Sequence, residues 1–110
     1  MAKKVADQLV DTLEKAGVRR IYAVTGDSLN EVNEAVRKSG RLRWIHVRHE
    51  ETGAYAAPAE AQMTGELACC AGSSGPGHVH LINGLYDAQR SGAPVLAIAS
   101  TIPSREFGTE

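Results

Sequence analysis

Apolar and polar residues follow two alternating patterns along the chain. Between residues 3 and 16 apolar side chains recur every three or four positions and Gly17 follows, which predicts an amphipathic helix ended by a glycine. Residues 20–24 form a short, β-branched apolar run followed by Gly26 and Asp27, which predicts a strand and then a turn. The same signals predict further helices over residues 28–39, 49–64 and 78–90, and strands over 42–47, 66–71 and 94–99. This order predicts a doubly wound α/β domain, with a mostly parallel sheet covered by helices on both faces.

Two local features refine this outline. Ser28 and Glu31 have the spacing of a capping box, in which both side chains bind free N–H groups at the start of a helix. Pro58 falls inside the third predicted helix, where it removes one backbone hydrogen bond and presses on the carbonyl of Ala54. We therefore expect the second helix to begin near Ser28, and the third to be kinked or interrupted near Ala54.

Three of the predicted β-to-α connections carry candidate binding residues: Gly26-Asp27, His49-Glu50 and the loop 72–77. Right-handed crossovers place such connections at the carboxyl edge of a parallel sheet, where open α/β folds bind ligands. The loop 72–77 holds three glycines before a helix, and bare amides at a helix start can bind anions. Its spacing matches neither common glycine-rich phosphate motif, so anion binding and a purely structural turn both remain open.

Composition excludes several classes of protein. A chain of 110 residues forms one domain at most. Twelve basic and thirteen acidic residues give a net charge of -1 without a basic cluster, so we expect no nucleic-acid partner. No apolar run approaches the roughly 20 residues of a membrane helix, and the first ten residues lack a signal core, so we expect a cytoplasmic protein. Residues 101–110 follow neither pattern and leave the last strand without a covering helix, so the domain looks truncated.

Residue types alone give few chemical candidates. The adjacent Cys69 and Cys70 are expected to be reduced thiols in an apolar strand. The four histidines, at positions 46, 49, 78 and 80, provide no helical i, i+4 pair, so we expect no metal site. Glu50 could simply interact with the helix dipole, and His80 could be a surface histidine.

Several segments taken together change this interpretation: Val24–Asn30, Arg48–Glu51, Ala54–Ala57, Ala59–Gln62, Thr64–Glu66, Gly75–Gly77, His80–Asp87 and Pro94–Ala99. In this order and spacing they resemble the N-terminal pyrimidine-binding (PYR) domain of thiamine-diphosphate enzymes, a three-layer domain of flavodoxin-like or Rossmann-like type. The resemblance covers residues 5–108. Within the family it is strongest for the pyruvate oxidase branch, whose quinone-dependent members decarboxylate pyruvate oxidatively to acetate and CO2. It implies that residues 1–110 are an incomplete PYR domain, and that the FAD-binding and diphosphate-binding domains lie outside this chain.

The resemblance also implies roles for individual residues. Glu50 matches the catalytic carboxylate that hydrogen-bonds N1′ of the aminopyrimidine, and His80 matches a histidine close to the reacting carbon. The remaining cofactor-binding candidates belong to two loops beside the pyrimidine and the substrate pocket: Gly26, Asp27, Ser73, Ser74 and Gly75. The implied cofactors are thiamine diphosphate here, and Mg2+ and FAD in the other domains. The implied substrate is pyruvate, and the implied assembly is a homodimer or homotetramer with active sites between subunits, touching a membrane only through other regions.

Two positions depart from the family pattern. Pro58 replaces a small residue, and His78-Val79 differs from the residues that commonly follow Gly-Pro-Gly. Acetolactate synthase and phosphate-dependent pyruvate oxidase share Glu50 and the Gly-Pro-Gly loop, so both remain alternatives, as does a non-catalytic α/β binding module. We expect the isolated chain to be inactive and to bind thiamine diphosphate weakly, because only one end of the cofactor would be held.

Overall fold

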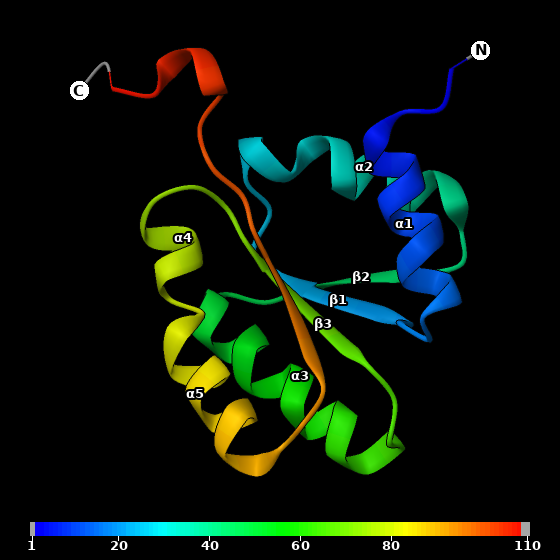
Figure 1. Cartoon of the computed structure of the whole chain (residues 1–110), viewed down its shortest axis with the longest axis vertical. Coiled ribbons are helices and arrows are strands. Elements are labelled where there is room, and N and C mark those ends of the chain that lie inside the picture. The colour runs from blue at the N-terminus through cyan, green and yellow to red at the C-terminus, as the bar shows by residue number, and fades with distance from the viewer. Residues whose placement is uncertain (1, 109–110) are drawn as a thin grey trace.

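A parallel sheet lies between two layers of helices in the computed structural model, which describes residues 2–108 (Figure 1). The helices are α1 (Val5–Lys15), α2 (Asn30–Ser39), α3 (Glu50–Thr64), α4 (Pro76–Val79) and α5 (Ile82–Ser91), with short 3-10 turns at Asp27–Leu29 (η1) and Ser104–Glu106 (η2). The strands are β1 (Arg20–Ala23), β2 (Arg43–His46), β3 (Ala68–Gly72) and β4 (Val95–Ala99), in the order β2-β1-β3-β4. All neighbouring strands pair in parallel, so the predicted three-layer α/β fold is confirmed. Within residues 2–108 no helix has the length and apolar character needed to cross a membrane.

The strand order explains how the helices are distributed. From β1 the chain passes through α2 to β2 on one side, and then through α3 to β3 on the other side of β1. Right-handed crossovers that run in opposite directions along a sheet place their helices on opposite faces. Helices α1 and α2 accordingly pack together on one face, and α3 and α5 on the other (Figure 1). The direction reverses between β1 and β3, and such a switch point is where open α/β sheets bind ligands.

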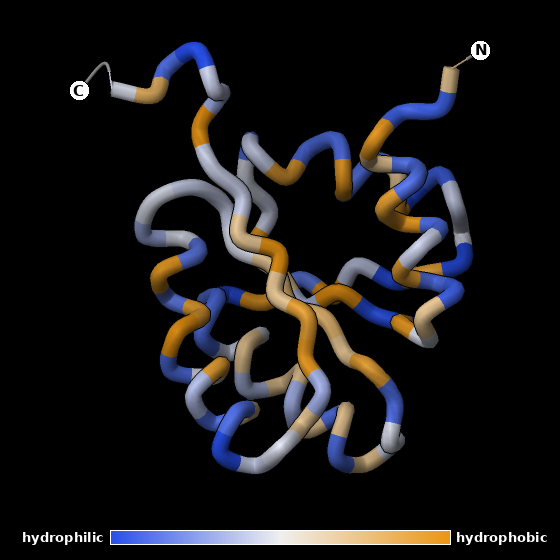
Figure 2. Tube along the Cα trace, viewed as in Figure 1, coloured by the Kyte–Doolittle hydropathy of each residue, from blue (hydrophilic) through white to orange (hydrophobic). Residues whose placement is uncertain are grey.

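Each face of the sheet has its own apolar core. Below α1 and α2 the core contains large aliphatic side chains such as Leu13, Ile21 and Leu29. Below α3 and α5 it consists mainly of alanines, with Leu81 as its largest fully buried member. Figure 2 shows the apolar residues concentrated along the strands and the hydrophilic residues on the outward turns of the helices. The alanine-rich core brings α3 and α5 close to the sheet and to each other.

Strand β3 is buried along its whole length and carries the two cysteines. Cys69 belongs to the core below α1 and α2, while Cys70 belongs to the core below α3 and α5, because successive strand residues face opposite sides. Both are free thiols, as expected. Burial raises the pKa of Cys69 to about 12 and that of Cys70 to about 11.

Two expected helix starts are wrong. Helix α2 begins at Asn30 rather than Ser28, and no side-chain hydrogen bond caps it. The Ser28 hydroxyl is instead bound to residues of the neighbouring loops, so the predicted capping box does not form. The helix expected over residues 78–90 is two helices, because α4 begins earlier, with Pro76 in its first turn, and the chain breaks at His80 and Leu81 before α5.

Helix α3 accommodates Pro58 without interruption. It runs from Glu50 to Thr64 as a single α-helix, so the expected interruption near Ala54 is wrong, while a kink there stays a prediction. Pro58 is fully buried, and α5 crosses α3 where the proline has removed the helical partner of the Ala54 carbonyl. At this crossing a Cβ on Gly84 would come under 3.0 Å from the Ala54 C, O and Cβ atoms. Only glycine allows the two backbones to approach this closely.

Candidate functional site

Serine hydroxyls join three of the loops at the carboxyl edge of the sheet. The Oγ atom of Ser28, after β1, lies 2.8 Å from Oγ of Ser73 after β3, and 2.7 Å from Oγ of Ser100 after β4. Ser28 Oγ also accepts the backbone N–H of Ser74 at 3.1 Å. Gly26 packs directly against the Ser73 side chain. The loops that flank the topological switch point are therefore fixed to each other, and Gly26 and Ser73, one from each predicted cofactor loop, lie together.

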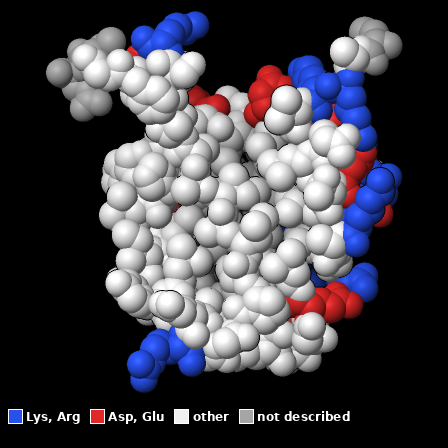
Figure 3. Space-filling view, viewed as in Figure 1, with Lys and Arg blue, Asp and Glu red and all other residues white. Residues whose placement is uncertain are grey.

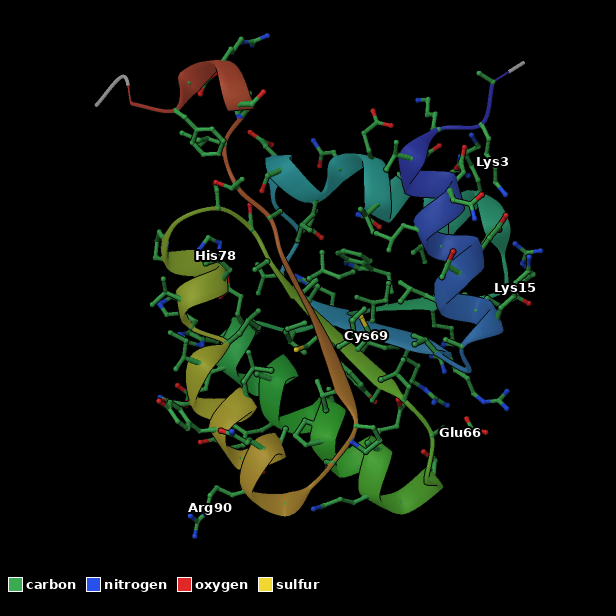
Figure 4. The ribbon with its side chains drawn as sticks, viewed as in Figure 1. Lys3, Lys15, Glu66, Cys69, His78 and Arg90 are labelled. Atoms are coloured by element: carbon green, nitrogen blue, oxygen red, sulfur yellow. The ribbon has the colours of Figure 1, made fainter. Side chains whose placement is uncertain are left out.

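The loop after β3 is also fixed to the end of β4. The imidazole Nδ1 of His78, in α4, lies 2.8 Å from the Ser100 carbonyl oxygen. Figure 4 shows His78 on α4, beside the chain that leaves the sheet after β4. This bond uses one of the residues that depart from the family pattern, so His78 has a structural partner within the domain.

The predicted catalytic residues meet at the same edge. Glu50 is the first residue of α3, and its side chain is only 12% exposed. His80, in the break between α4 and α5, places Nδ1 3.2 Å from Glu50 Oε1. Within residues 2–108 the second carboxylate oxygen of Glu50, Oε2, has no hydrogen-bond partner. A Cβ on Gly77 would lie 3.3 Å from this oxygen, so the bare glycine keeps the space beside it open.

The structure adds His49, which the sequence indicated only as the start of a helix. Its Nδ1 accepts the backbone N–H of Glu51 at 3.1 Å and so caps α3. Its ring lies against that of His80, with centroids 4.3 Å apart and planes 31° apart. The available sequence signal for His49 was its position directly before the predicted helix, where side chains that accept the first free N–H groups are favoured.

His49, Glu50 and His80 also raise the question of a metal site, because one candidate ligand atom from each lies within 4.8 Å of the others. However, His49 Nδ1 already accepts the Glu51 N–H, and Glu50 Oε1 already binds His80. These bonds use one atom of each residue and leave His49 Nε2, Glu50 Oε2 and His80 Nε2 without a hydrogen-bond partner among residues 2–108. The three residues form a hydrogen-bonded cluster, and the expectation of no metal site stays a prediction.

The other predicted site residues lie beside this cluster. Asp27 is exposed, and with Ser28, Ser74 and residues 101–103 it lines a pocket of about 430 Å³. Gly75 is exposed at the turn before α4, with φ of 68°. A larger pocket, of about 510 Å³ between α2 and β2, contains none of the predicted site residues. The candidate site is thus the switch-point edge, with Glu50 on one side and the serine-lined pocket on the other.

Comparison with known proteins identifies the family. Residues 3–110 match the family described as "Thiamine pyrophosphate enzyme, N-terminal TPP binding domain". The chain belongs to this family. It is 63% identical, over 96% of its length, to a Pseudomonas amyloderamosa protein described as an uncharacterized 42.6 kDa protein in the isoamylase 3′ region, of which it covers 26%.

Two further relatives are enzymes by name. The chain is 44% identical, over 92% of its length, to pyruvate oxidase of Lactiplantibacillus plantarum, and covers 16% of that protein. It is 37% identical, over 98% of its length, to chloroplastic acetolactate synthase 3 of Brassica napus, and covers 17% of it. The chain thus spans between 16% and 26% of the length of these relatives.

Proposed function

We propose that this chain provides the pyrimidine-binding site of a thiamine-diphosphate- and FAD-dependent enzyme that decarboxylates pyruvate oxidatively to acetate and CO2, with quinone as electron acceptor. The higher identity to pyruvate oxidase than to acetolactate synthase supports the pyruvate oxidase branch over acetolactate synthase. The observation that carries the proposal is the Glu50 carboxylate, which is 12% exposed, held through Oε1 and open at Oε2.

The site fits the pyrimidine end of the cofactor. When bound, thiamine diphosphate supplies an acidic thiazolium C2–H and an aminopyrimidine able to remove that proton. Glu50 Oε2 is the atom that would share a proton with pyrimidine N1′, since no other described residue occupies it. His80 donates to Oε1 and keeps the carboxylate oriented, and the low exposure of Glu50 limits competition from water.

In this proposal the other components bind outside the chain. FAD and Mg2+ are held by further domains, and pyruvate lies between the pyrimidine end of the cofactor and those domains. The enzyme is cytoplasmic, with any contact to the inner face of the membrane made by regions outside this chain. A homo-oligomer is supported by the largely uncharged face seen in Figure 3, and by exposed apolar side chains on α4 and α5 such as Val79, Ile82 and Tyr86.

Acetolactate synthase is the second candidate, supported by the 37% identity over nearly the whole chain, and phosphate-dependent pyruvate oxidase is the third. Product analysis of the enzyme that carries this domain separates the three. Acetate formed with quinone reduction supports the proposal, acetolactate supports the second candidate, and acetyl phosphate supports the third. A non-catalytic binding module is the outcome if the gene encodes no diphosphate-binding G-D-G segment followed by N-N.

The role of Glu50 is tested by replacing it with glutamine in that enzyme. We expect Glu50→Gln to slow exchange of the cofactor C2 proton, followed by NMR, by at least about 100-fold, because glutamine cannot share the proton. Glu51→Gln is the matched control, since Glu51 is the next residue of α3 but binds Asn83 instead, at 3.0 Å. Exchange at the wild-type rate in Glu50→Gln would contradict the assignment.

A further inference from the structure

The His49 ring is oriented by the helix that it caps. His49 precedes α3 in an extended conformation, with φ of -148° and ψ of 137°. Its Nδ1 accepts the backbone N–H of Glu51 at 3.1 Å. A backbone N–H can only donate, so this nitrogen is unprotonated and the ring proton of the neutral imidazole is on Nε2. The cap therefore fixes both the orientation and the tautomer of His49.

His80 lies against this fixed ring. The two centroids are 4.3 Å apart and the planes are tilted by 31°, so the two imidazoles are in contact. His80 lies in the break between α4 and α5, and its side chain is 41% exposed. The contact with the His49 ring therefore limits rotation of the His80 side chain, which is otherwise accessible to solvent.

His80 passes this constraint on to Glu50. Its Nδ1 lies 3.2 Å from Glu50 Oε1, and an ionised carboxylate only accepts hydrogen bonds, so His80 carries its proton on Nδ1. The two rings therefore differ at Nδ1, which accepts a hydrogen bond in His49 and donates one in His80. The contacts therefore form a continuous series. The Glu51 N–H binds His49, the His49 ring contacts the His80 ring, and His80 binds the side chain of Glu50, which lies on the same helical turn as Glu51.

We propose that His49 is a positioning residue that holds the His80 ring, and through it the Glu50 carboxylate, so that Oε2 stays free to face a ligand. The proposal rests on the proposed function, since it names what orients the carboxylate used there. This role goes beyond helix capping, because a side chain without a ring, such as asparagine, could cap α3 equally well.

Two substitutions separate capping from positioning. Asparagine caps helices well but has no ring, so His49→Asn keeps the cap and removes the ring contact with His80. Phenylalanine cannot accept a hydrogen bond from the Glu51 N–H but has a flat ring, so His49→Phe keeps the ring contact with His80 and removes the cap. His46→Asn is the control, because His46 is an exposed histidine at the end of β2.

The test is nitrogen-15 NMR of the imidazole rings in the 110-residue chain without cofactor, together with urea unfolding. In the wild type we expect the proton on Nε2 of His49 and on Nδ1 of His80. In His49→Asn we expect His80 to lose part of its Nδ1–H form and its ring order, while the unfolding equilibrium constant changes less than about twofold. In His49→Phe we expect His80 to stay as in the wild type, while that constant rises about fivefold.

Three results would overturn the proposal. The first is a wild-type His49 protonated on Nδ1, which requires no mutant. The second is an unchanged His80 spectrum in His49→Asn, and the third is equal loss of His80 order in His49→Phe. All are measured without cofactor, so they are independent of whether the chain binds thiamine diphosphate, and failure of the proposed function would leave them unchanged.

Discussion

Replacing Gly84 with alanine should weaken the contact between α3 and α5. The new Cβ would come under 3.0 Å from three atoms of Ala54, and two of them, C and O, belong to the backbone. Backbone atoms cannot rotate away as the end of a side chain can, so the helices must separate. Such overpacking costs about 1–3 kcal/mol, and the rigid contact places Gly84→Ala near the upper end. Alanine is favoured over glycine within a helix by about 1 kcal/mol, which leaves a net loss of about 2 kcal/mol.

Urea unfolding followed by circular dichroism measures this loss. Gly53→Ala is the control within α3, because its Cβ would lie 3.1 Å from Tyr22 Cβ and O, and we expect it to lose clearly less stability. Adding Ala54→Gly to Gly84→Ala removes one of the three contacted atoms, so we expect partial rescue only. A Gly84→Ala protein as stable as the wild type, or full rescue in the double variant, would refute the reasoning.

Three further predictions concern the two buried thiols and the partly buried hydroxyls of Tyr22 and Ser28. The pKa is about 12 for Cys69 and about 11 for Cys70, instead of 9.0 for an ordinary thiol. At pH 8 the thiolate should therefore be roughly 1,000-fold rarer for Cys69 and roughly 100-fold rarer for Cys70 than for an ordinary thiol. Rapid labelling of the folded chain by iodoacetamide would contradict this prediction. The pKa of Tyr22 is raised by burial, and further by the charge of Glu60 and its hydrogen bond. Because only the unfolded chain ionises this tyrosine near pH 10, stability should fall above that pH, and Glu60→Gln should lower the Tyr22 midpoint measured by tyrosinate absorbance. Ser28→Ala should cost about 1–3 kcal/mol in urea unfolding by leaving the Ser74 N–H without its acceptor, and a loss below about 0.5 kcal/mol would count against the hydroxyl network.

The local spacing of apolar residues predicted most of the helices and strands, because that spacing reflects which face of each element is buried against a neighbouring layer. They failed at Ser28 because the partners of its hydroxyl, Ser73 and Ser100, lie 45 and 72 residues away, whereas a capping box contains only local information. The break at His80 was missed because the apolar period of α5 continues through it.

The site was predictable only in part. Resemblance to the family named both Glu50 and His80 as site residues, but it did not predict their contact, which joins residues 30 apart in sequence at 3.2 Å. His49 was missed as a site residue because its contact with His80 depends on the crossing of α3 and the chain between α4 and α5, which no local spacing encodes.

The opposite orientations of Cys69 and Cys70 have a consequence for dynamics. One thiol is sealed by the layer of α1 and α2, and its neighbour by the layer of α3 and α5. Proteins open locally in cooperative units of different stability, and a buried thiol reacts only when its own cover opens. The slow labelling rates of these adjacent residues should therefore report separately on the two layers. A faster rate at Cys70 than at Cys69, after correction for thiolate population, would mean that the layer bearing Glu50 opens first.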